Sequence, residues 1–274
     1  MVLPLLFLLF LFQSDSPPPG YKTGIKITMV LNERSPDAIE NTFYLQHDRS
    51  RQESRYKDGR PIKGSGVSVV RCDMRQSLYF APDSLTYTAR PYPPPRITEA
   101  GARAWGLRTT PNYRTVEPTL RIERSYKDTG ERKEFFGYTA RHIITTTRVI
   151  PLEDRRSLPR TKVRDGWYIN LGRTSCEQQY AVETRDDPVI YSSWTVENVQ
   201  TVTTGDVPDP AESWMPAEEK AISWQTVMLS DGSTKEVLLP GSELHITKIE
   251  EIPMDPALFG PPAFNAKTPI VGLH

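Results

Sequence analysis

The sequence predicts a mainly β protein built around a bent antiparallel sheet. Among its 274 residues are 25 prolines, which remove a backbone donor and clash with helix interiors. Thr, Val, Ile, Tyr and Trp are frequent in the central segments, and these residue types favour strands. Several short segments also alternate apolar and polar side chains, as strands with one buried face do.

The alternation is clearest in the first part of the chain, where four apolar side chains occupy every second position: Ile25, Ile27, Met29 and Leu31. Further strands are predicted at 41–47, 67–72, 77–80 and 85–89, the last two joined by a turn. The segment 48–60 that follows the strand at 41–47 is charged and ends in Asp-Gly, which is a turn signal. This order predicts a meander of neighbouring antiparallel strands.

The second half of the chain also predicts short strands, after an interruption at residues 90–118. Residues 90–118 are rich in Pro, Gly and Arg and are expected to form a long irregular insertion, either a lid over the open face or a plain surface excursion. Strands then resume, with turns at 128–130 and 230–233: 119–126, 131–136, 141–150, 167–171, 193–202, 223–229, 234–239 and 243–252.

The first residues form an apolar run from Leu3 to Phe12, too short to span a bilayer but of the length of a secretory signal core. No Lys or Arg precedes the run and no small-x-small motif follows it, so a buried strand or a membrane-surface anchor stays open. We divide the chain into a signal peptide or apolar anchor (1–14), a proline-rich linker (15–21), one β domain (22–265) and a tail (266–274). Export would place the protein in the periplasm or extracytoplasmic envelope.

The only two cysteines, Cys72 and Cys176, are compatible with one disulfide if the chain is exported. The bond would close a loop of about 100 residues and contribute up to about 4–5 kcal/mol in the chain-entropy model. Two unpaired thiols are the alternative. Two cysteines this far apart are not a zinc motif, and no metal site is expected.

Charge is divided unevenly along a chain whose formal net charge is zero. Residues 1–176 hold 29 Lys and Arg against 18 Asp and Glu, whereas residues 177–274 hold 5 against 16. The two halves would attract each other within one domain, or the basic half would face an anionic partner such as lipid head groups. A third interpretation is that these charges only coat the solvent-facing positions of strands.

Motifs of catalysis and cofactor binding are absent from the sequence. There is no phosphate-binding glycine loop, no HExxH and no nucleophile elbow. The histidines, which show no metal-ligand spacing and are interpreted as ordinary strand or surface residues, are His47, His142, His245 and His274. Acidic residues that a hairpin would bring together are interpreted as ordinary cross-strand neighbours: Glu123, Glu131 and Glu134. We therefore expect no enzyme, no cofactor and no nucleic-acid partner.

Three segments carry a resemblance to a known group: VVRCDMRQSLYFAPDSLTYT, EFFGYTARHIITTTRV and IEEIPMDPALFGPPAFN. They resemble LolA/LolB-like bacterial envelope proteins of unassigned function, loosely, over residues 22–265. The resemblance implies a half-barrel of antiparallel strands with one or two short helices over its concave face. Better-known members of the group shuttle lipoproteins by holding acyl chains there. The stretches 90–118 and 186–216 exceed the compact frame of that group.

A half-barrel with an incompletely covered apolar face offers a binding site for apolar molecules. The positions expected to line the hollow, or alternatively to form a plain core, are Ile27, Met29, Leu31, Phe43, Leu45, Tyr79, Tyr87, Ile144, Trp167 and Ile169. The leading hypothesis is an exported carrier of an apolar or amphipathic ligand, a lipid or lipoprotein acyl chain, without a transmembrane span. The alternative is a non-catalytic structural or assembly module that binds other envelope proteins.

Overall fold

The structure is a computed structural model that describes residues 22–80, 87–92, 120–152, 158–171, 189–192, 195–205, 214–261 and 270–271. Its strands are β1 (Lys22–Leu31), β2 (Ile39–Gln46), β3 (Arg49–Tyr56), β4 (Val67–Arg71), β5 (Gln76–Phe80), β6 (Tyr87–Pro91), β7 (Leu120–Phe135), β8 (Tyr138–Pro151), β9 (Arg160–Ile169), β10 (Val189–Ser192), β11 (Thr195–Gly205), β12 (Met215–Met228), β13 (Thr234–Met254) and β14 (Ile270–Val271). Two short 3-10 turns accompany them, η1 (Cys72–Met74) and η2 (Pro256–Phe259).

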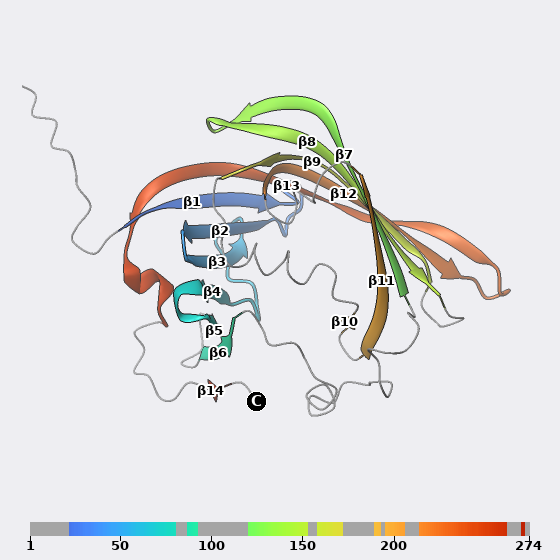
Figure 1. Cartoon of the computed structure of the whole chain (residues 1–274), viewed down its shortest axis with the longest axis horizontal. Coiled ribbons are helices and arrows are strands. Elements are labelled where there is room, and N and C mark those ends of the chain that lie inside the picture. The colour runs from blue at the N-terminus through green and yellow to red at the C-terminus, as the bar shows by residue number, and fades with distance from the viewer. Residues whose placement is uncertain are drawn as a thin grey trace, which may run out of the picture.

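The described strands form one curved, open sheet in the order β10-β11-β7-β8-β9-β12-β13-β1-β2-β3-β4-β5-β6-β14 (Figure 1). All neighbouring pairs are antiparallel except β11 with β7 and β14 with β6. This confirms the predicted mainly β class with a curved antiparallel sheet, and helices are almost absent. Within the described ranges, no helix is long and apolar enough to cross a bilayer.

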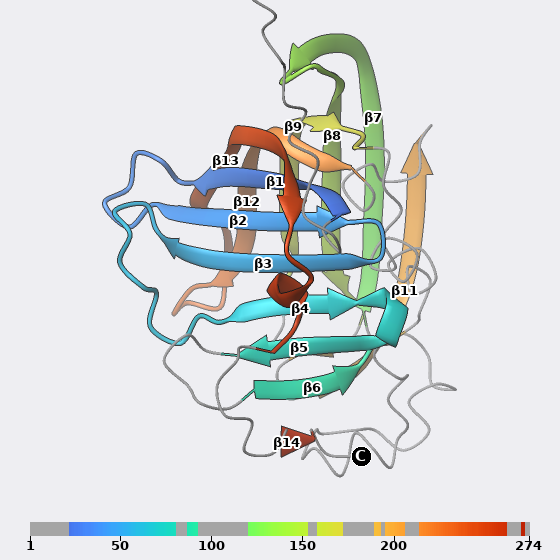
Figure 2. The same cartoon turned by 90° about the vertical axis from the view of Figure 1, so that its left-hand side faces the viewer.

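The first six strands are the predicted meander, each hydrogen-bonded to the next in sequence (Figure 2). The turn signal at Asp58-Gly59 is confirmed, with a φ of 88° at Gly59. The charged residues before it form β3, a strand that the sequence does not predict, which pairs with β2 from Gln46↔Arg49 to Ile39↔Tyr56. Polar side chains are tolerated because long Arg and Gln stems cover neighbouring apolar surface while their heads stay in water. Arg51, for example, lies with its guanidinium 5.5 Å from the centre of the Phe80 ring.

A second correction concerns the hairpin of β7 and β8. The sequence predicts the turn at residues 128–130, but β7 continues through this point with a register shift between Asp128 and Arg132. The chain reverses at Phe136 and Gly137, whose φ angles of 52° and 82° suit a tight two-residue hairpin turn. Residues 129–131 of β7 stand opposite His142 alone on β8, and this bulge of two extra residues explains why the Asp-Thr-Gly sequence does not end the strand.

The strands in the middle of the open sheet come from distant parts of the sequence. β13 pairs with β1 from Lys22↔Met254 to Leu31↔Leu244, and β12 pairs with β9. The distal halves of β12 and β13, residues 222–239, form a hairpin that we call the arm, seen at the right of Figure 1.

Buried apolar side chains gather in two main clusters. The first cluster joins strands of both halves of the chain and contains Ile25, Ile27, Met29, Ala140, Ile169, Ala217 and Ile246. The second cluster lies on the meander and contains Val67, Val69, Leu78, Phe80, Met254 and Phe259. The first cluster therefore joins strands of both halves of the sheet, whereas the second joins the meander to the end of β13 and the turn η2.

The turn η2 supplies the apolar cover of the meander. Phe259 is fully buried in the second cluster, and Figure 2 shows η2 in front of β3 and β4, on the side that faces away from β11 in Figure 1. Two arginines hold η2 through its carbonyls: Arg51 donates to Leu258 O at 2.8 Å and Arg71 to Phe259 O at 3.3 Å. Asp255 caps the turn by accepting from the backbone N–H of Ala257.

Candidate functional site

Six of the ten residues expected to line a hollow pack together in the first core cluster. Three of these are buried within it: Ile27, Met29 and Ile169. Three more are partly buried and pack against the cluster: Phe43, Leu45 and Trp167. These six positions therefore belong to one apolar cluster.

The other four expected residues lie apart from that cluster. Tyr87 packs against the second cluster, on the meander. Tyr79 is 46% exposed and donates its hydroxyl to Gly64 O at 3.2 Å. Leu31 and Ile144 are half-buried. The ten residues thus occupy more than one environment.

Cys72 is disulfide-bonded in the structure. Cys176, the only other cysteine of the chain, lies outside the described residues, so the predicted partnership stays a prediction.

His142 is the histidine with the most contacts in the described chain. Its Nε2 lies 2.6 Å from Asp165 Oδ1, its Nδ1 lies 3.4 Å from Glu131 Oε2, and its ring stacks on Trp167 at 4.8 Å. The Thr129 hydroxyl lies 3.1 Å from Nδ1 and also accepts from the backbone N–H of Glu131. The described residues hold no group of three His, Cys, Asp or Glu side chains placed to bind a metal ion.

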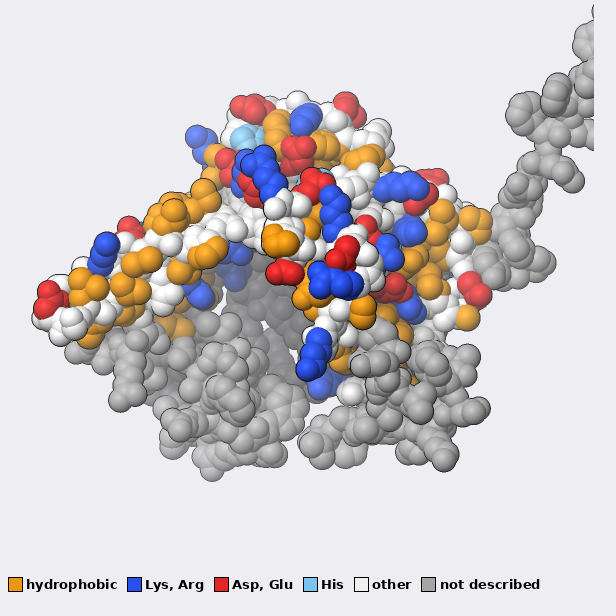
Figure 3. All heavy atoms as spheres, turned by 180° about the vertical axis from the view of Figure 1, so that it is seen from behind, with side chains coloured by type: hydrophobic (Ala, Val, Ile, Leu, Met, Phe, Trp, Pro, Cys, Tyr) orange, Lys and Arg blue, Asp and Glu red, His pale blue; other side chains and the backbone are white. Residues whose placement is uncertain are grey.

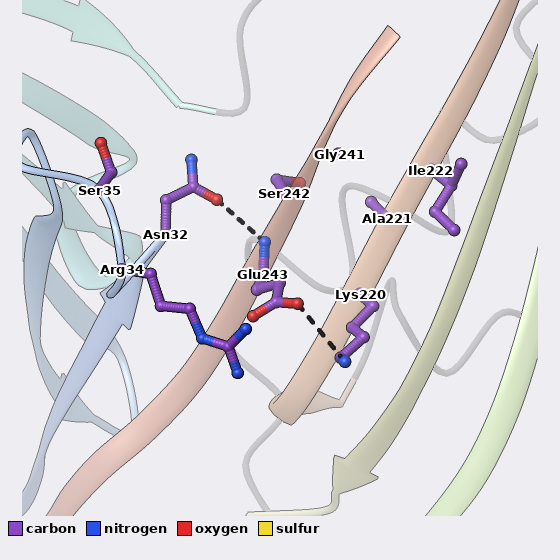
Figure 4. A pocket seen from close by; sticks show the side chains of 9 residues that line it. All are labelled: Asn32, Arg34, Ser35, Lys220, Ala221, Ile222, Gly241, Ser242 and Glu243. Carbon is purple, nitrogen blue, oxygen red and sulfur yellow. Dashed lines mark hydrogen bonds and ion pairs between the residues drawn. The ribbon is translucent and has the colours of Figure 1, made fainter. Parts of the chain in front are cut away.

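A hollow of about 650 Å³ lies where the β1–β2 turn meets the base of the arm (Figure 4). Three segments line it: Asn32, Arg34 and Ser35 from the turn, Lys220, Ala221 and Ile222 from β12, and Gly241, Ser242 and Glu243 from β13. None of these residues was singled out from the sequence, because the hollow combines positions more than 180 residues apart.

Backbone geometry holds the three segments in place. Asn32 adopts a φ of 54°, and its backbone N–H donates to Glu243 O at 2.7 Å while its Oδ1 accepts from Glu243 N at 3.0 Å. Asn tolerates this left-handed conformation better than most residues. On the other side, the pairing of β12 with β13 shifts register between Ala221 and Ser223. A Cβ at Gly241 would lie 3.0 Å from Ala221 O, so glycine allows the two strands to approach here.

Cationic groups outnumber carboxylates around the hollow. Lys220 Nζ lies 3.4 Å from Glu243 Oε1, and both side chains are at least half exposed. Such an exposed pair is weak, typically below about 1 kcal/mol. In the part of the chain that the structure describes, the Arg34 guanidinium makes no hydrogen bond or ion pair. The charge of Arg34 does act on the neighbouring Glu33 carboxylate, so the hollow has one cation without a direct partner and one that is loosely paired.

An exposed apolar row starts at the edge of this hollow. The register of β12 with β9 is unbroken from Glu218 to Gln225, so Lys220, Ile222 and Trp224 project from the same face of the sheet. Met228 continues that face, and Leu238 lies directly opposite Trp224 on β13. We call Ile222, Trp224, Met228 and Leu238 the apolar row.

The apolar row is open to solvent. Ile222 is 43% exposed, Met228 65% and Leu238 61%, whereas Trp224 is half-buried. Figure 3 shows hydrophobic side chains spread along the arm on this side of the molecule. One carboxylate interrupts the face, since Glu236 lies opposite Thr226. The sequence shows Ile222, Trp224 and Met228 at positions of one strand face, with Thr226 between the last two, but it does not show that this face lacks a cover.

Comparison with known proteins adds no relative. No protein-family model matches the chain, and no curated protein matches it. The resemblance to LolA/LolB-like envelope proteins therefore stays a prediction, and the site has to be judged by its geometry alone.

Proposed function

We propose that this protein binds lipid through the arm, with the apolar row inserted among the acyl chains of an anionic lipid surface. The observation that carries the proposal is the row itself, whose large apolar side chains are exposed together on one sheet face beside a cationic hollow. Scattered exposed hydrophobic residues are ordinary on soluble proteins, but a contiguous set marks an interaction surface. The function is binding, without a catalytic step.

The energetics favour weak, reversible association. Full burial of one large apolar side chain contributes about 1.5–3 kcal/mol relative to full exposure. The row members are already partly covered, so each would contribute less. Trp224 suits the boundary between head groups and acyl chains, where the amphipathic indole ring is enriched. The cations of the hollow add attraction to anionic head groups.

The proposal keeps the ligand class expected from the sequence and gives it a different surface. The expected lining residues mostly pack into core clusters, whereas the apolar row faces outward. Export to the bacterial envelope remains part of the proposal and is supported by the apolar run Leu3–Phe12, which lies outside the described residues. Lipids or lipoproteins, and other envelope proteins, are the partners that this location would offer.

Vesicle flotation tests the proposal directly. Wild-type protein is expected to float with vesicles that contain phosphatidylglycerol, and a variant with Ile222→Ser, Met228→Ser and Leu238→Ser is expected to lose most of this binding. Met74→Ser is the matched control, since Met74 is 58% exposed but lies on η1. Equal flotation of the wild type and the triple variant would show that the row does not bind lipid.

The alternative, a structural or assembly module, gives a different result in the same samples. Wild-type protein would then bind no vesicle, and the apolar row would be covered by a second copy of the chain or by another protein. Sedimentation velocity would reveal self-association that the triple variant abolishes and Met74→Ser preserves.

A further inference from the structure

The geometry points to a specific anion site: we infer that Arg34 and Lys220 bind the phosphodiester of one lipid head group in the hollow at the base of the arm. The inference rests on the proposed function and deepens it, because it names the head-group chemistry that the lipid surface must present. It is carried by the composition of the hollow, by the arginine without a direct partner and by the position of the hollow beside the apolar row.

The donors of the hollow converge from separate elements. Figure 4 shows Arg34 reaching from the turn toward Glu243, while Lys220 approaches the same carboxylate from β12. Ser242 lines the same space, whereas the Ser35 hydroxyl accepts the backbone N–H of Asp37 at 3.1 Å and points away from the two cations in Figure 4. Guanidinium, ammonium and hydroxyl groups are the donors that recognise phosphate oxygens, and the arginine fork suits two oxygens at once.

The available charge identifies the kind of phosphate. Two cations and one carboxylate, Glu243, line the hollow, so the lining residues carry one net positive charge, which the neighbouring Glu33 carboxylate partly offsets at Arg34. A singly charged phosphodiester balances this charge. A phosphomonoester, with a charge of about −1.5 to −2 at neutral pH, would be repelled by the Glu243 carboxylate. The site is therefore expected to prefer diesters over inorganic phosphate.

The apolar row beside the hollow would contact the acyl chains of the lipid. Lys220 and Ile222 are two residues apart on one face of β12, a separation of about 6.6 Å along a strand. A head group held by Lys220 thus places its acyl chains next to Ile222, at the start of the apolar row. Charge complementarity and apolar surface together commit this face to an anionic lipid rather than to a neutral one.

Two charge-neutralising variants test the site. Arg34→Gln and Lys220→Gln are each expected to lower the affinity for phosphatidylglycerol vesicles about tenfold, the loss typical of one charge-assisted hydrogen bond, and to leave any binding to phosphatidylcholine vesicles unchanged. Lys235→Gln is the matched control, because Lys235 is an exposed lysine of the same hairpin outside the hollow. Equal losses in all three variants would overturn the site in favour of general electrostatic attraction.

A soluble probe separates this inference from the proposed function. Glycerophosphoglycerol, a phosphodiester without acyl chains, is expected to bind the wild type weakly in calorimetry and not to bind Arg34→Gln. Glu243→Gln is expected to raise binding of inorganic phosphate more than binding of the diester. If the probe binds in this pattern but no vesicle does, the site stands and the lipid function fails. If vesicles bind through the apolar row while Arg34→Gln and Lys220→Gln behave as wild type, the site fails alone.

Discussion

Asp73 shows how one carboxylate organises the end of β4. Arg71 donates to it at 2.7 and 2.8 Å, and Arg49 donates at 3.0 Å from β3. The hydrogen bonds from Arg71, aided by the charges of Arg71 and Arg49, hold the pKa of Asp73 below its ordinary value of 3.8 despite partial burial. The same arginines of the meander thus link its strands to η1, while Arg71 also donates to η2.

The lowered pKa of Asp73 predicts an acid-sensitive contribution to stability. A carboxyl group whose folded pKa is lowered stabilises the fold above its unfolded pKa, and this stability is lost as the pH falls through the folded pKa. Because the site is partly exposed, the contribution is about 1 kcal/mol or less. We expect the free energy of urea unfolding to fall between about pH 6 and pH 2 in the wild type, and to fall less in Asp73→Asn. Parallel pH curves for the two proteins would contradict the assignment.

Gly24 is required by a close approach rather than by a turn. A Cβ at this position would lie 2.4 Å from Met254 Sδ and 2.8 Å from the Leu45 carbonyl oxygen. The methionine end can move, but the backbone oxygen of β2 cannot move without disturbing the sheet. The glycine therefore lets β1 fit between β2 and β13.

Gly24→Ala is predicted to destabilise the fold by roughly 1–3 kcal/mol, the usual cost of overpacking a filled interior. Thermal or urea unfolding measures the effect. Gly260→Ala serves as the control, because the nearest atom to a Cβ there is Ala257 O at 3.4 Å, an ordinary contact. A Gly24→Ala protein as stable as this control would show that the strands relax around the methyl group.

At the scale of elements, η2 is a short turn that covers the apolar side chains of the meander. Its Phe259 fills the apolar cluster on the meander, while its carbonyls are satisfied by Arg51 and Arg71. A polar backbone turn could not lie on this face if those carbonyls lost their donors. The position of η2 depends on the pairing of β13 with β1, which brings the end of β13 next to the first strands.

Phe259→Ala should cost about 3–5 kcal/mol, because it removes a fully buried ring and leaves a cavity. The measurement is urea unfolding followed by far-ultraviolet circular dichroism. Met228→Ala, in which a 65% exposed side chain is shortened on the arm, is expected to change stability by less than about 0.5 kcal/mol. Equal effects of the two substitutions would refute the role of η2 as cover.

The arm leaves large apolar side chains exposed on one face of the sheet. On the arm, Ile222, Met228 and Leu238 are exposed, whereas residues 223–227 are half-buried on both faces of β12. Two-residue alternation normally directs apolar residues inward and polar residues outward. On the arm the solvent-facing side carries the apolar row. For this reason we place the binding surface on the arm and not in the core.

At the scale of the whole molecule, strands of the basic first half and the acidic last part of the chain are neighbours. β1 pairs with β13, so Lys26 lies opposite Glu250, and β9 pairs with β12. Ion pairs join the two parts directly, as between Lys133 and Glu218 at 3.3 Å and between Arg164 and Glu219 at 3.8 Å. Some of the basic residues of the first half and the acidic residues of the last part therefore form ion pairs within one sheet.

The predicted Cys72–Cys176 disulfide is a second long-range connection. If it forms, breaking it would restore the freedom of a loop of about 100 residues in the unfolded chain and lower stability by up to about 4–5 kcal/mol in the chain-entropy model. Peptide mapping without reducing agent should find the two cysteine peptides linked, and reductant should lower the melting temperature. Cys72→Ser/Cys176→Ser protein should then be insensitive to reductant. Unlinked peptides from protein purified without reductant would contradict the pairing.

The amino-acid sequence by itself determined the strand class, because proline content and two-residue alternation are local properties of the chain. It identified Ile27, Met29 and Ile169 as interior positions for the same reason. It did not identify β3 as a strand, since the segment is highly charged and its long side chains find their apolar contacts only across the sheet. Nor did it locate the hairpin turn, because a bulge and a turn both use Asp, Thr and Gly.

Only the tertiary structure decided which strands are neighbours and which apolar face stays open. Alternation reveals that one side of a strand is apolar, but covering that side depends on elements that pair or pack over long sequence separations. The hollow with Arg34 and Lys220 arises from the pairing of β1 with β13 and from a bulge between β12 and β13. Such a site has no local signature, because its residues become neighbours only when the sheet has formed.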